Sequence, residues 1–431
     1  MRSITIGTRM ARLRPRKSAL AAAAVLSAAL LLSLASCQNN YGIYASIQQE
    51  EPGSTTGPFY ETSVGKVIKF GSVYYAQRST LDSSADGVNW NPSPVKIAGF
   101  DTNYACLSMA SNATALYVIA YGIDSSNNPY GLGLYSTTDG STWTPVITND
   151  SAMESIFEAN GNIFIVDHTG PGATQASPTT TLNDAWSLHY LSGPQTLTAV
   201  PVTNLPNGSP IVGVAYAYSY YWLIAAADQS GGVYGGVYAM ASASLGSGSF
   251  TAAGSGSTAG IPSIIDPLAI MTAASTGVLY IGDYSGNVYR ITTSGTAFTA
   301  ISSAVSSYSI ACFAEVPTSL SSNVILAGLG MSSWSLGNAG IDYGYVQLDP
   351  SSSTLAPTSG DSSVTVPNNT NYDTTIYGKP VNYLSWIPDG SGTSGKLYAG
   401  TASAGISAAS GLWLDPWNNS SNPAWSGWSP E

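Results

Sequence analysis

Charged residues, and the residue types that build catalytic or metal sites, are scarce in this sequence. Only 9% of its 431 residues are charged, and it contains two histidines and three cysteines. His168 and His189 lie in a different part of the chain from any cysteine, so a dedicated zinc site is not expected. The motifs Gly-x-Ser-x-Gly and Asp-x-Asp-x-Asp-Gly are absent, which argues against a hydrolase nucleophile elbow and a calcium loop. We therefore expect no metal and no cofactor.

Positive charge is almost missing after residue 37. The whole chain has 13 Lys and Arg and 24 Asp and Glu, and six of the basic residues, but no acid, precede position 37. The remainder therefore carries seven basic residues against 24 acids, a net charge of −17. A surface of this sign repels phosphate backbones and anionic lipids, so no nucleic-acid partner is expected.

The N-terminus has the three-part order of an export signal. Residues 1–17 are basic, residues 19–35 form an apolar run, and small residues precede Cys37. The segment Leu34-Ala35-Ser36-Cys37 resembles the lipobox of bacterial lipoproteins, whose cysteine receives a diacylglyceryl group before cleavage. The resemblance implies a signal peptide at 1–36 and an exported protein that is anchored to a membrane through lipidated Cys37.

Two details refine this interpretation. Residue 38 is Gln where Asp would imply retention in the inner membrane, so the resemblance points to the outer membrane or the cell surface. The alternative is an uncleaved membrane anchor, for which an apolar run of about 17 residues is at the short limit. Residues 37–62, with Gln, Glu, Pro, Gly and Thr, are expected to form a lipidated tether and the first strand.

The rest of the chain repeats one pattern: four to eight apolar or aromatic residues, then a turn of Gly, Asn, Asp or Ser. No stretch has the periodicity of a long amphipathic helix, so an all-β fold is expected. Paired strand signals divide residues 63–431 into units of about 53 residues, enough for four short strands. The sequence predicts one β-propeller domain, with seven blades of four antiparallel strands favoured over six or eight. The units begin near residues 63, 103, 153, 208, 264, 308 and 380.

An eight-residue unit recurs at Ser83–Trp90 and Ser136–Trp143, with weaker copies at 292–299 and 244–250. Its Asp can accept backbone N–H bonds within a turn, Gly can adopt positive φ, and Trp can pack beneath the turn. The unit resembles the Asp-box hairpin (BNR repeat) of sialidase-like propellers in its relaxed form, although Ala85 and Thr138 stand where that pattern usually has Asp. The residues that carry the resemblance are Asp86, Gly87, Trp90, Asp139, Gly140 and Trp143.

The resemblance to sialidases does not extend to their activity. Those enzymes clamp a substrate carboxylate with three arginines, which offer planar bidentate donors. Only Arg78 and Arg290 remain after Cys37, so three guanidinium groups cannot be assembled and no catalytic residue is carried over. Glycosidases in general need only two carboxylates. Glu158, Asp266 and Glu315 fall in or beside expected innermost strands and are candidate channel-facing acids; alternatively, they are solvated rim residues or bind backbone turns.

Three further features are interpreted as structural. Cys106 and Cys312 lie in similar apolar strands and are expected to be buried small hydrophobic residues, with a disulfide as the alternative. The two histidines are also expected to be structural. Gly390–Lys396 fits most of a phosphate loop, but a strand rather than a helix is expected to follow, so we interpret it as a hairpin turn.

Aromatic residues crowd two regions, and we expect them to fill the space between blades rather than to form a binding patch. An exposed group of them would instead stack on sugars or anchor a protein. The residues are Tyr216, Tyr218, Tyr220, Tyr221, Trp222, Trp413, Trp417, Trp425 and Trp428.

Together these features favour a non-catalytic cell-envelope lipoprotein whose propeller is a binding or scaffolding module for a protein or glycan ligand. The alternative is a glycan-directed protein, either a lectin-like binder or a divergent glycoside hydrolase that depends on carboxylates. The step from fold to function rests on fold analogy.

Overall fold

The structure is a computed structural model, and the residues it describes all belong to one compact unit, Thr55–Glu431. The proposed signal peptide, Cys37 and the tether at 37–62 lie outside the described residues, as do Trp417, Trp425, Trp428 and the side chain of Trp413. The description covers residues 64–430 except 98, 101–102, 149, 151, 170–184, 228–233, 265, 295–296, 306–307, 318–322, 331–343, 349, 351–354, 356–379, 391–393, 402–410 and 416–428.

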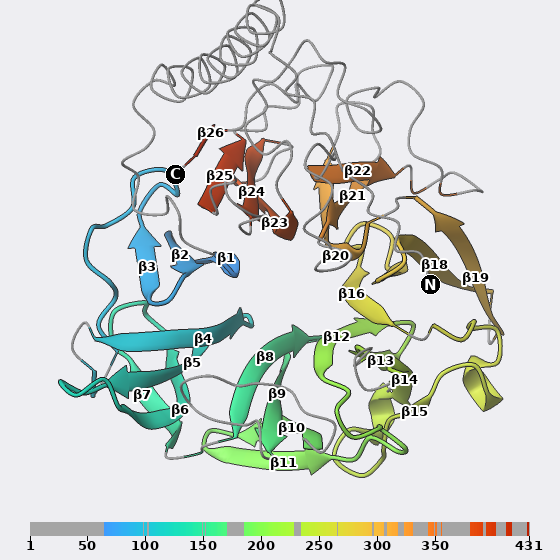
Figure 1. The fold of residues 1–431 in the computed structure, drawn as a ribbon, viewed down its shortest axis with the longest axis horizontal. Coiled ribbons are helices and arrows are strands. Elements are labelled where there is room, and N and C mark those ends of the chain that lie inside the picture. The colour runs from blue at the N-terminus through green and yellow to red at the C-terminus, as the bar shows by residue number, and fades with distance from the viewer. Residues whose placement is uncertain are drawn as a thin grey trace, which may run out of the picture. The chain divides into compact units, whose positions relative to one another are not determined.

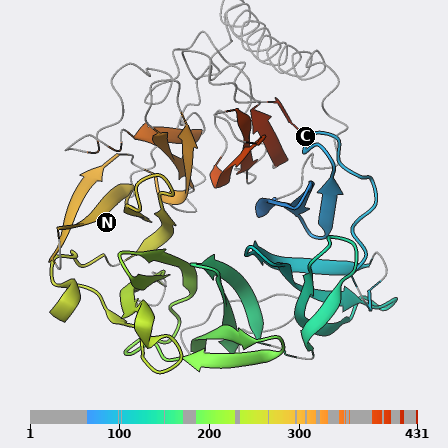
Figure 2. The same cartoon turned by 180° about the vertical axis from the view of Figure 1, so that it is seen from behind.

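Seven antiparallel sheets are arranged around a central axis, one after another in chain order (Figure 1). Each sheet is one blade, built from consecutive strands, and the same ring is seen from behind in Figure 2. Blade 1 contains β1 (Lys66–Phe70), β2 (Val73–Gln77) and β3 (Leu81–Ser84); blade 2 contains β4 (Tyr104–Ser111), β5 (Leu116–Ile123), β6 (Pro129–Thr137) and β7 (Thr144–Thr148); blade 3 contains β8 (Met153–Ala159), β9 (Asn162–Thr169), β10 (Ala185–Gly193) and β11 (Thr196–Val200).

The remaining blades follow the same order. Blade 4 contains β12 (Ile211–Ala217), β13 (Tyr220–Ala225), β14 (Gly236–Ala241) and β15 (Thr251–Ala252), with short 3-10 turns η2 (Ser242–Ser244) and η3 (Gly256–Thr258); blade 5 contains β16 (Pro267–Thr272), β17 (Leu279–Asp283), β18 (Asn287–Ser294) and β19 (Ala297–Ala304); blade 6 contains β20 (Ile310–Pro317), β21 (Asn323–Leu329) and β22 (Gly344–Leu348); blade 7 contains β23 (Val381–Pro388), β24 (Gly395–Thr401), β25 (Gly411–Asp415) and β26 (Ser429–Pro430).

This arrangement confirms the predicted seven-bladed β-propeller. The first strand of each blade begins no more than three residues from the predicted start of its unit. Within the described part of the chain, five blades have four strands, and blades 1 and 6 have three. No helix among these residues has the length and hydropathy needed to cross a bilayer.

The fourth position of blade 1 is occupied by an irregular segment instead of a strand. Ser84 and Trp90 form an isolated antiparallel bridge, and the Asn91 and Val95 amides donate to carbonyls of β3 at 2.9 and 2.8 Å. Pro92 and Pro94 lie between these two amides. Because proline has no N–H group, the segment runs beside β3 without forming a regular ladder.

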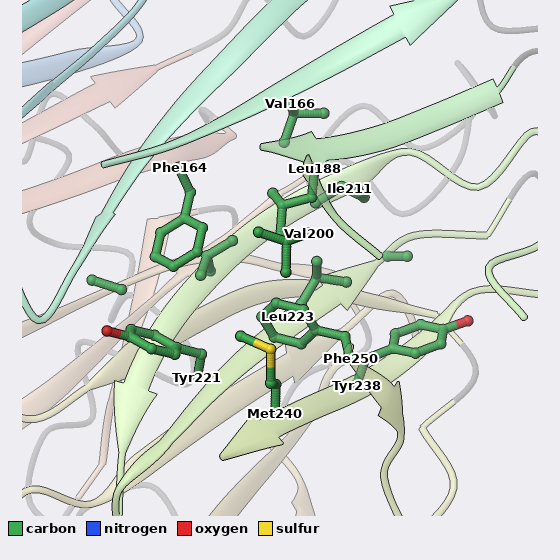
Figure 3. Close-up of a cluster of buried hydrophobic side chains, with 13 residues drawn as sticks. Phe164, Val166, Leu188, Val200, Ile211, Tyr221, Leu223, Tyr238, Met240 and Phe250 are labelled. Carbon is green, nitrogen blue, oxygen red and sulfur yellow. The ribbon is translucent and has the colours of Figure 1, made fainter. Parts of the chain in front are cut away.

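The second strand of each blade is largely buried because both of its faces are covered by neighbouring blades. Every residue of β17 and six of the eight residues of β9 are buried. Figure 3 shows one of the resulting cores, in which Phe164 of blade 3 packs edge-on against Tyr221 of blade 4 with ring centroids 5.2 Å apart. The core therefore consists of separate layers between blades, each formed by strands that are adjacent in the ring.

A β-bulge recurs near the start of the innermost strand in blades 2 to 7. The pairing with the second strand shifts by one residue there in all six blades, whereas β1 pairs regularly with β2 from Lys66 to Phe70. Opposite the bulge of blade 6 stands Gly328, where a Cβ would lie 2.4 Å from Cys312 Sγ. A bulge bends the strand and changes the direction of its side chains, so this position shapes the centre of the ring.

Blade 7 lies beside blade 1 in the ring (Figure 1), and side chains join these two blades. Tyr383 Oη donates to the Val67 carbonyl at 2.7 Å, and Tyr398 Oη donates to the Gly87 carbonyl at 2.9 Å. Among the described strands, none is exchanged between the first and last blades. Among the described residues, the two blades are held together by these hydrogen bonds and by the apolar cluster that includes Val67, Tyr74 and Leu412.

Candidate ligand site in the central channel

The innermost strands of all seven blades surround a cavity of about 830 Å³. This volume lies within the range of small-molecule binding pockets. The lining residues are Gly65, Lys66, Val67, Ile68, Lys69 and Gln77 of blade 1 and its flank, Ser108 and Ser111 of blade 2, Phe157 and Glu158 of blade 3, Val212, Gly213 and Val214 of blade 4, Leu268, Ala269 and Ile270 of blade 5, Ala311, Cys312 and Phe313 of blade 6, and Asn382–Pro388 of blade 7.

The two sides of this channel differ in chemistry. In the described part of the lining, the charged residues come from blades 1 and 3, namely Lys66, Lys69 and Glu158. The lining contributed by blades 4, 5 and 6 contains only aliphatic residues, one glycine, one cysteine and one phenylalanine. The channel therefore has a charged wall and an apolar wall, and blades 2 and 7 add serine, asparagine and tryptophan between them.

Lys66 is the residue of the charged wall whose pKa is most strongly shifted by its surroundings. Its Nζ donates to the Met109 carbonyl of blade 2 at 3.1 Å. Burial lowers the pKa of Lys66 to about 8, although the negative charge of Glu158 acts in the opposite direction. Because desolvation outweighs the attraction to Glu158, this ammonium group is poorly compensated by the protein.

Lys69 lies on the same strand and interacts with an aromatic ring. Its Nζ is 5.0 Å from the ring centroid of Tyr74, and Lys396 Nζ lies 5.5 Å from the same ring. Asp389 neutralises Lys396 at 2.8 Å and also accepts a hydrogen bond from Tyr74 Oη at 3.3 Å. Asp389 thus pairs with Lys396 and not with Lys69. Lys69 adds a second positive charge to the channel wall beside that of Lys66.

The three candidate acids lie in different surroundings. Glu158 is exposed and lines the channel, and its Oε1 accepts the Gly161 N–H at 2.6 Å in the β8–β9 turn. Asp266 precedes β16, and its Oδ1 accepts the Ala227 N–H of blade 4 at 3.1 Å. Each therefore accepts a backbone N–H group, Glu158 within a turn and Asp266 from the segment that follows β13.

Glu315 lies on the innermost strand β20 but lines a second cavity of about 540 Å³ that blades 5, 6 and 7 share. Its Oε2 accepts the Ala274 N–H of blade 5 at 2.6 Å, its Oε1 accepts from Asn323 Nδ2 at 2.9 Å, and Ser275 Oγ also contacts it. With these donors around both oxygens, the carboxylate joins two blades.

The two strong copies of the eight-residue unit have the same hydrogen bonds. Asp86 Oδ1 accepts the Val88 and Asn89 N–H groups at 2.9 and 2.7 Å, and Asp139 Oδ1 accepts those of Ser141 and Thr142 at 2.8 and 2.7 Å. These backbone donors hold the pKa of both carboxyls well below the usual range. The following residues, Gly87 and Gly140, have φ of 75° and 78°. Trp90 and Trp143 are buried.

A contact that the sequence did not indicate joins each of these hairpins to the preceding blade. Tyr75 of blade 1 donates to the Gly140 carbonyl of blade 2 at 2.9 Å, just as Tyr398 of blade 7 donates to Gly87 of blade 1. A Cβ on Gly140 or Gly87 would lie 2.4 or 2.2 Å from the respective hydroxyl. In the weaker copy of blade 4, a Cβ on Gly246 would lie 2.8 Å from Tyr190 Oη of blade 3. The hairpin is thus also a contact between blades.

The histidines and cysteines have structural contacts. His168 is buried and stacks on Trp186 with ring centroids 4.2 Å apart, and His189 Nδ1 lies 2.9 Å from Asp167 Oδ2. The hydrogen bond that His189 donates to the Asp167 carboxylate raises the pKa of His189. Cys106 and Cys312 are free thiols at the equivalent third position of β4 and β20, as predicted; Cys106 is buried, whereas Cys312 is half-buried and lines the channel. No group of three or more potential metal ligands is found among the residues that the structure describes.

The aromatic residues of blade 4 fill space between blades, as predicted. Tyr221 and Trp222 are buried, and Tyr216, Tyr218 and Tyr220 pack against the adjoining clusters. The large apolar side chains that are exposed in the described part of the chain are Val88, Tyr130 and Tyr234, in three different blades. They form no single aromatic patch. The segment Gly390–Lys396 leads into strand β24.

Comparison with known proteins identifies no family. No family model and no curated protein matches the sequence. Among solved structures, YCF48 from Cyanidioschyzon merolae is 12% identical with a TM-score of 0.43, covering 82% of this chain and 95% of that one. A chain of a Mitotic Checkpoint Complex is 12% identical with a TM-score of 0.44, covering 84% and 95%, and the computationally designed Ika8 protein is 9% identical with a TM-score of 0.38, covering 81% and 83%.

Proposed function

We propose that this protein is an exported, lipid-anchored binding protein of the cell envelope, and that its propeller holds ligands without transforming them. The observation that carries the proposal is the central channel, to which the inner strands of all seven blades contribute. Pockets of this size with a few convergent polar groups are typical ligand sites.

Two observations support binding over catalysis. The three candidate acids each accept backbone N–H groups, which favours a role in holding turns and joining blades. Glu158 alone among them lines the channel, whereas a glycosidase needs two carboxylates in one pocket. The recurring Asp hairpins support the resemblance to Asp-box propellers, in which the motif is a mark of fold.

The anchoring part of the proposal is tested through Cys37. Cells grown with an alkyne-labelled fatty acid should incorporate it into the wild type, and Cys37→Ser should abolish the label and release the protein from membranes or leave the precursor uncleaved. Cys312→Ser is the matched control, because it changes a thiol of the propeller and should keep the label. Membrane fractionation and mass unchanged by Cys37→Ser would contradict lipidation.

Sorting between membranes is tested at the next residue. Gln38→Asp should move the protein to the inner membrane if wild-type Gln38 directs it outward. Density-gradient separation of the two membranes gives the result, and an unchanged distribution of the variant would contradict outer-membrane sorting through this position.

The glycan-directed alternative is kept because Trp386 and Phe157 line the channel and could stack on a sugar. Incubation of the purified protein with a panel of glycosides should give no turnover. Hydrolysis that is lost in Glu158→Gln would replace the proposed function with catalysis.

A further inference from the structure

We propose that the central channel binds a small amphipathic anion, with the carboxylate of the ligand at Lys66 and its hydrocarbon part against the apolar wall formed by blades 4, 5 and 6. This inference rests on the proposed binding function and names the ligand class of that site.

The charge of the channel is opposite to that of the protein. The whole chain carries a net charge of −11, yet two lysines and one glutamate line the channel. Lys66 and Lys69 are two of only seven basic residues after Cys37. An acidic protein with its scarce positive charge in a central cavity offers a local attraction for anions that the rest of its surface lacks.

The ammonium group of Lys66 retains hydrogen-bonding capacity for a ligand. An ammonium group has three donors, and the Met109 carbonyl accepts one of them. Glu158 is the only acid among the described residues that line the channel, and its Oε1 accepts the Gly161 N–H at 2.6 Å. A ligand carboxylate at Lys66 would supply a charge-assisted hydrogen bond where burial now disfavours the charged lysine.

The opposite wall selects for an apolar body. Val212, Leu268 and Ile270 are half-buried apolar residues in the lining from blades 4 and 5, and Ala311 and Cys312 extend this lining into blade 6. The hydroxyls of a sugar placed on this wall would lose water without gaining partners, which is costly. A hydrocarbon chain or a single aromatic ring can pack against this wall without leaving polar groups unpaired. The carboxylate of the same ligand then lies at the lysines of the charged wall.

The experiment uses three ligands of nearly equal shape: 4-phenylbutyrate, 4-phenylbutanamide and 4-phenylbutylamine. Binding to the full-length lipidated protein in phospholipid nanodiscs is measured by calorimetry, with empty nanodiscs as the blank. The wild type should bind the anion at least about tenfold more tightly than the amide, and the cation most weakly.

Two lysine variants locate the charge. Lys66→Met keeps the length of the side chain and should reduce affinity for the anion to that for the amide. Lys96→Met is the matched control, because Lys96 is exposed on blade 1 and is absent from the channel lining, so it should bind like the wild type. Leu268→Ser should reduce the affinities for the anion and for the amide by the same factor, since this substitution changes only the apolar wall. Thermal unfolding of each variant confirms that it is folded.

Each outcome decides the inference. Equal affinity of the wild type for anion and amide, or an unchanged preference in Lys66→Met, would overturn the role of the charge. No binding of any of the three ligands would overturn the amphipathic-anion proposal, whereas the proposed function would fail separately, on glycoside turnover or on the absence of lipid at Cys37.

Discussion

The contact between Tyr75 and Gly140 gives a quantitative test of how blades are held together. In Gly140→Ala, the new Cβ would stand at φ 78° and 2.4 Å from Tyr75 Oη. The left-handed conformation costs about 1–2 kcal/mol for a residue with a Cβ. Displacing the tyrosine also removes a hydrogen bond worth about 1 kcal/mol. The variant should therefore lose about 2–3 kcal/mol of unfolding free energy.

Removing the hydroxyl first should reduce this loss. Tyr75→Phe alone should cost about 1 kcal/mol, since the buried ring remains and one hydrogen bond is lost. The next atom from a Cβ at position 140 is Tyr75 Cζ, at an ordinary contact distance of 3.7 Å. When Tyr75→Phe is already present, Gly140→Ala should then cost only the backbone conformation, and the two substitutions should be less than additive by about 1 kcal/mol.

The equivalent pair at the ring closure is the control. A Cβ on Gly87 meets Tyr398 Oη at 2.2 Å, but it also meets two ring atoms of Tyr74 at 3.0 and 3.1 Å. Tyr398→Phe should therefore rescue Gly87→Ala less completely than Tyr75→Phe rescues Gly140→Ala. Urea unfolding followed by tryptophan fluorescence supplies the free energies of all variants. If Gly140→Ala costs the same in the wild type and in the Tyr75→Phe variant, the hydroxyl does not hold the hairpin.

Three further predictions concern other sites. Ser219 is exposed in the β12–β13 turn and has a φ of 64°, which favours glycine. Ser219→Gly should therefore raise the free energy of unfolding by about 1 kcal/mol, measured by urea unfolding. A decrease would contradict backbone strain at this position. Because the pKa of Lys66 falls to about 8 on folding, the wild type should become more stable between pH 8 and 10 relative to Lys66→Met, and a constant difference in melting temperature would refute this. Burial raises the pKa of Cys106 to about 12, so a thiol reagent at pH 8 should label Cys106 only after denaturation, and labelling of this residue in the folded protein would contradict its burial.

The features that the sequence predicted are those encoded within one hairpin. The Asp-x-x-x-Trp spacing after Asp86 and Asp139 determines a turn because each aspartate carboxylate accepts N–H groups from residues two and three positions later in the chain. The strand pairs likewise follow from apolar runs separated by Gly and Asn. Counting such pairs gave the number of blades, because each blade repeats the same local pattern.

The features that the sequence did not reveal depend on the closure of the ring. Tyr398 and Gly87 are 311 positions apart, and no local pattern relates them. Lys66 and Lys69 were not predicted as channel residues, although the scarcity of basic residues after Cys37 was a usable signal. Glu315 lies on an innermost strand as expected, but its carboxylate accepts hydrogen bonds from Ala274 of the neighbouring blade and from Asn323 of its own blade.

The charged wall and the closure of the ring meet at one strand. Six innermost strands carry a bulge, and β1, which pairs regularly with β2, is the strand that supplies both channel lysines. The residue after Lys66 is Val67, whose carbonyl accepts the closing hydrogen bond from Tyr383 of blade 7 at 2.7 Å. Tyr383 itself lines the channel. A ligand held at Lys66 would therefore contact the strand that closes the ring, so binding and the cohesion of the first and last blades should be coupled, because a ligand that binds only the folded ring stabilises it.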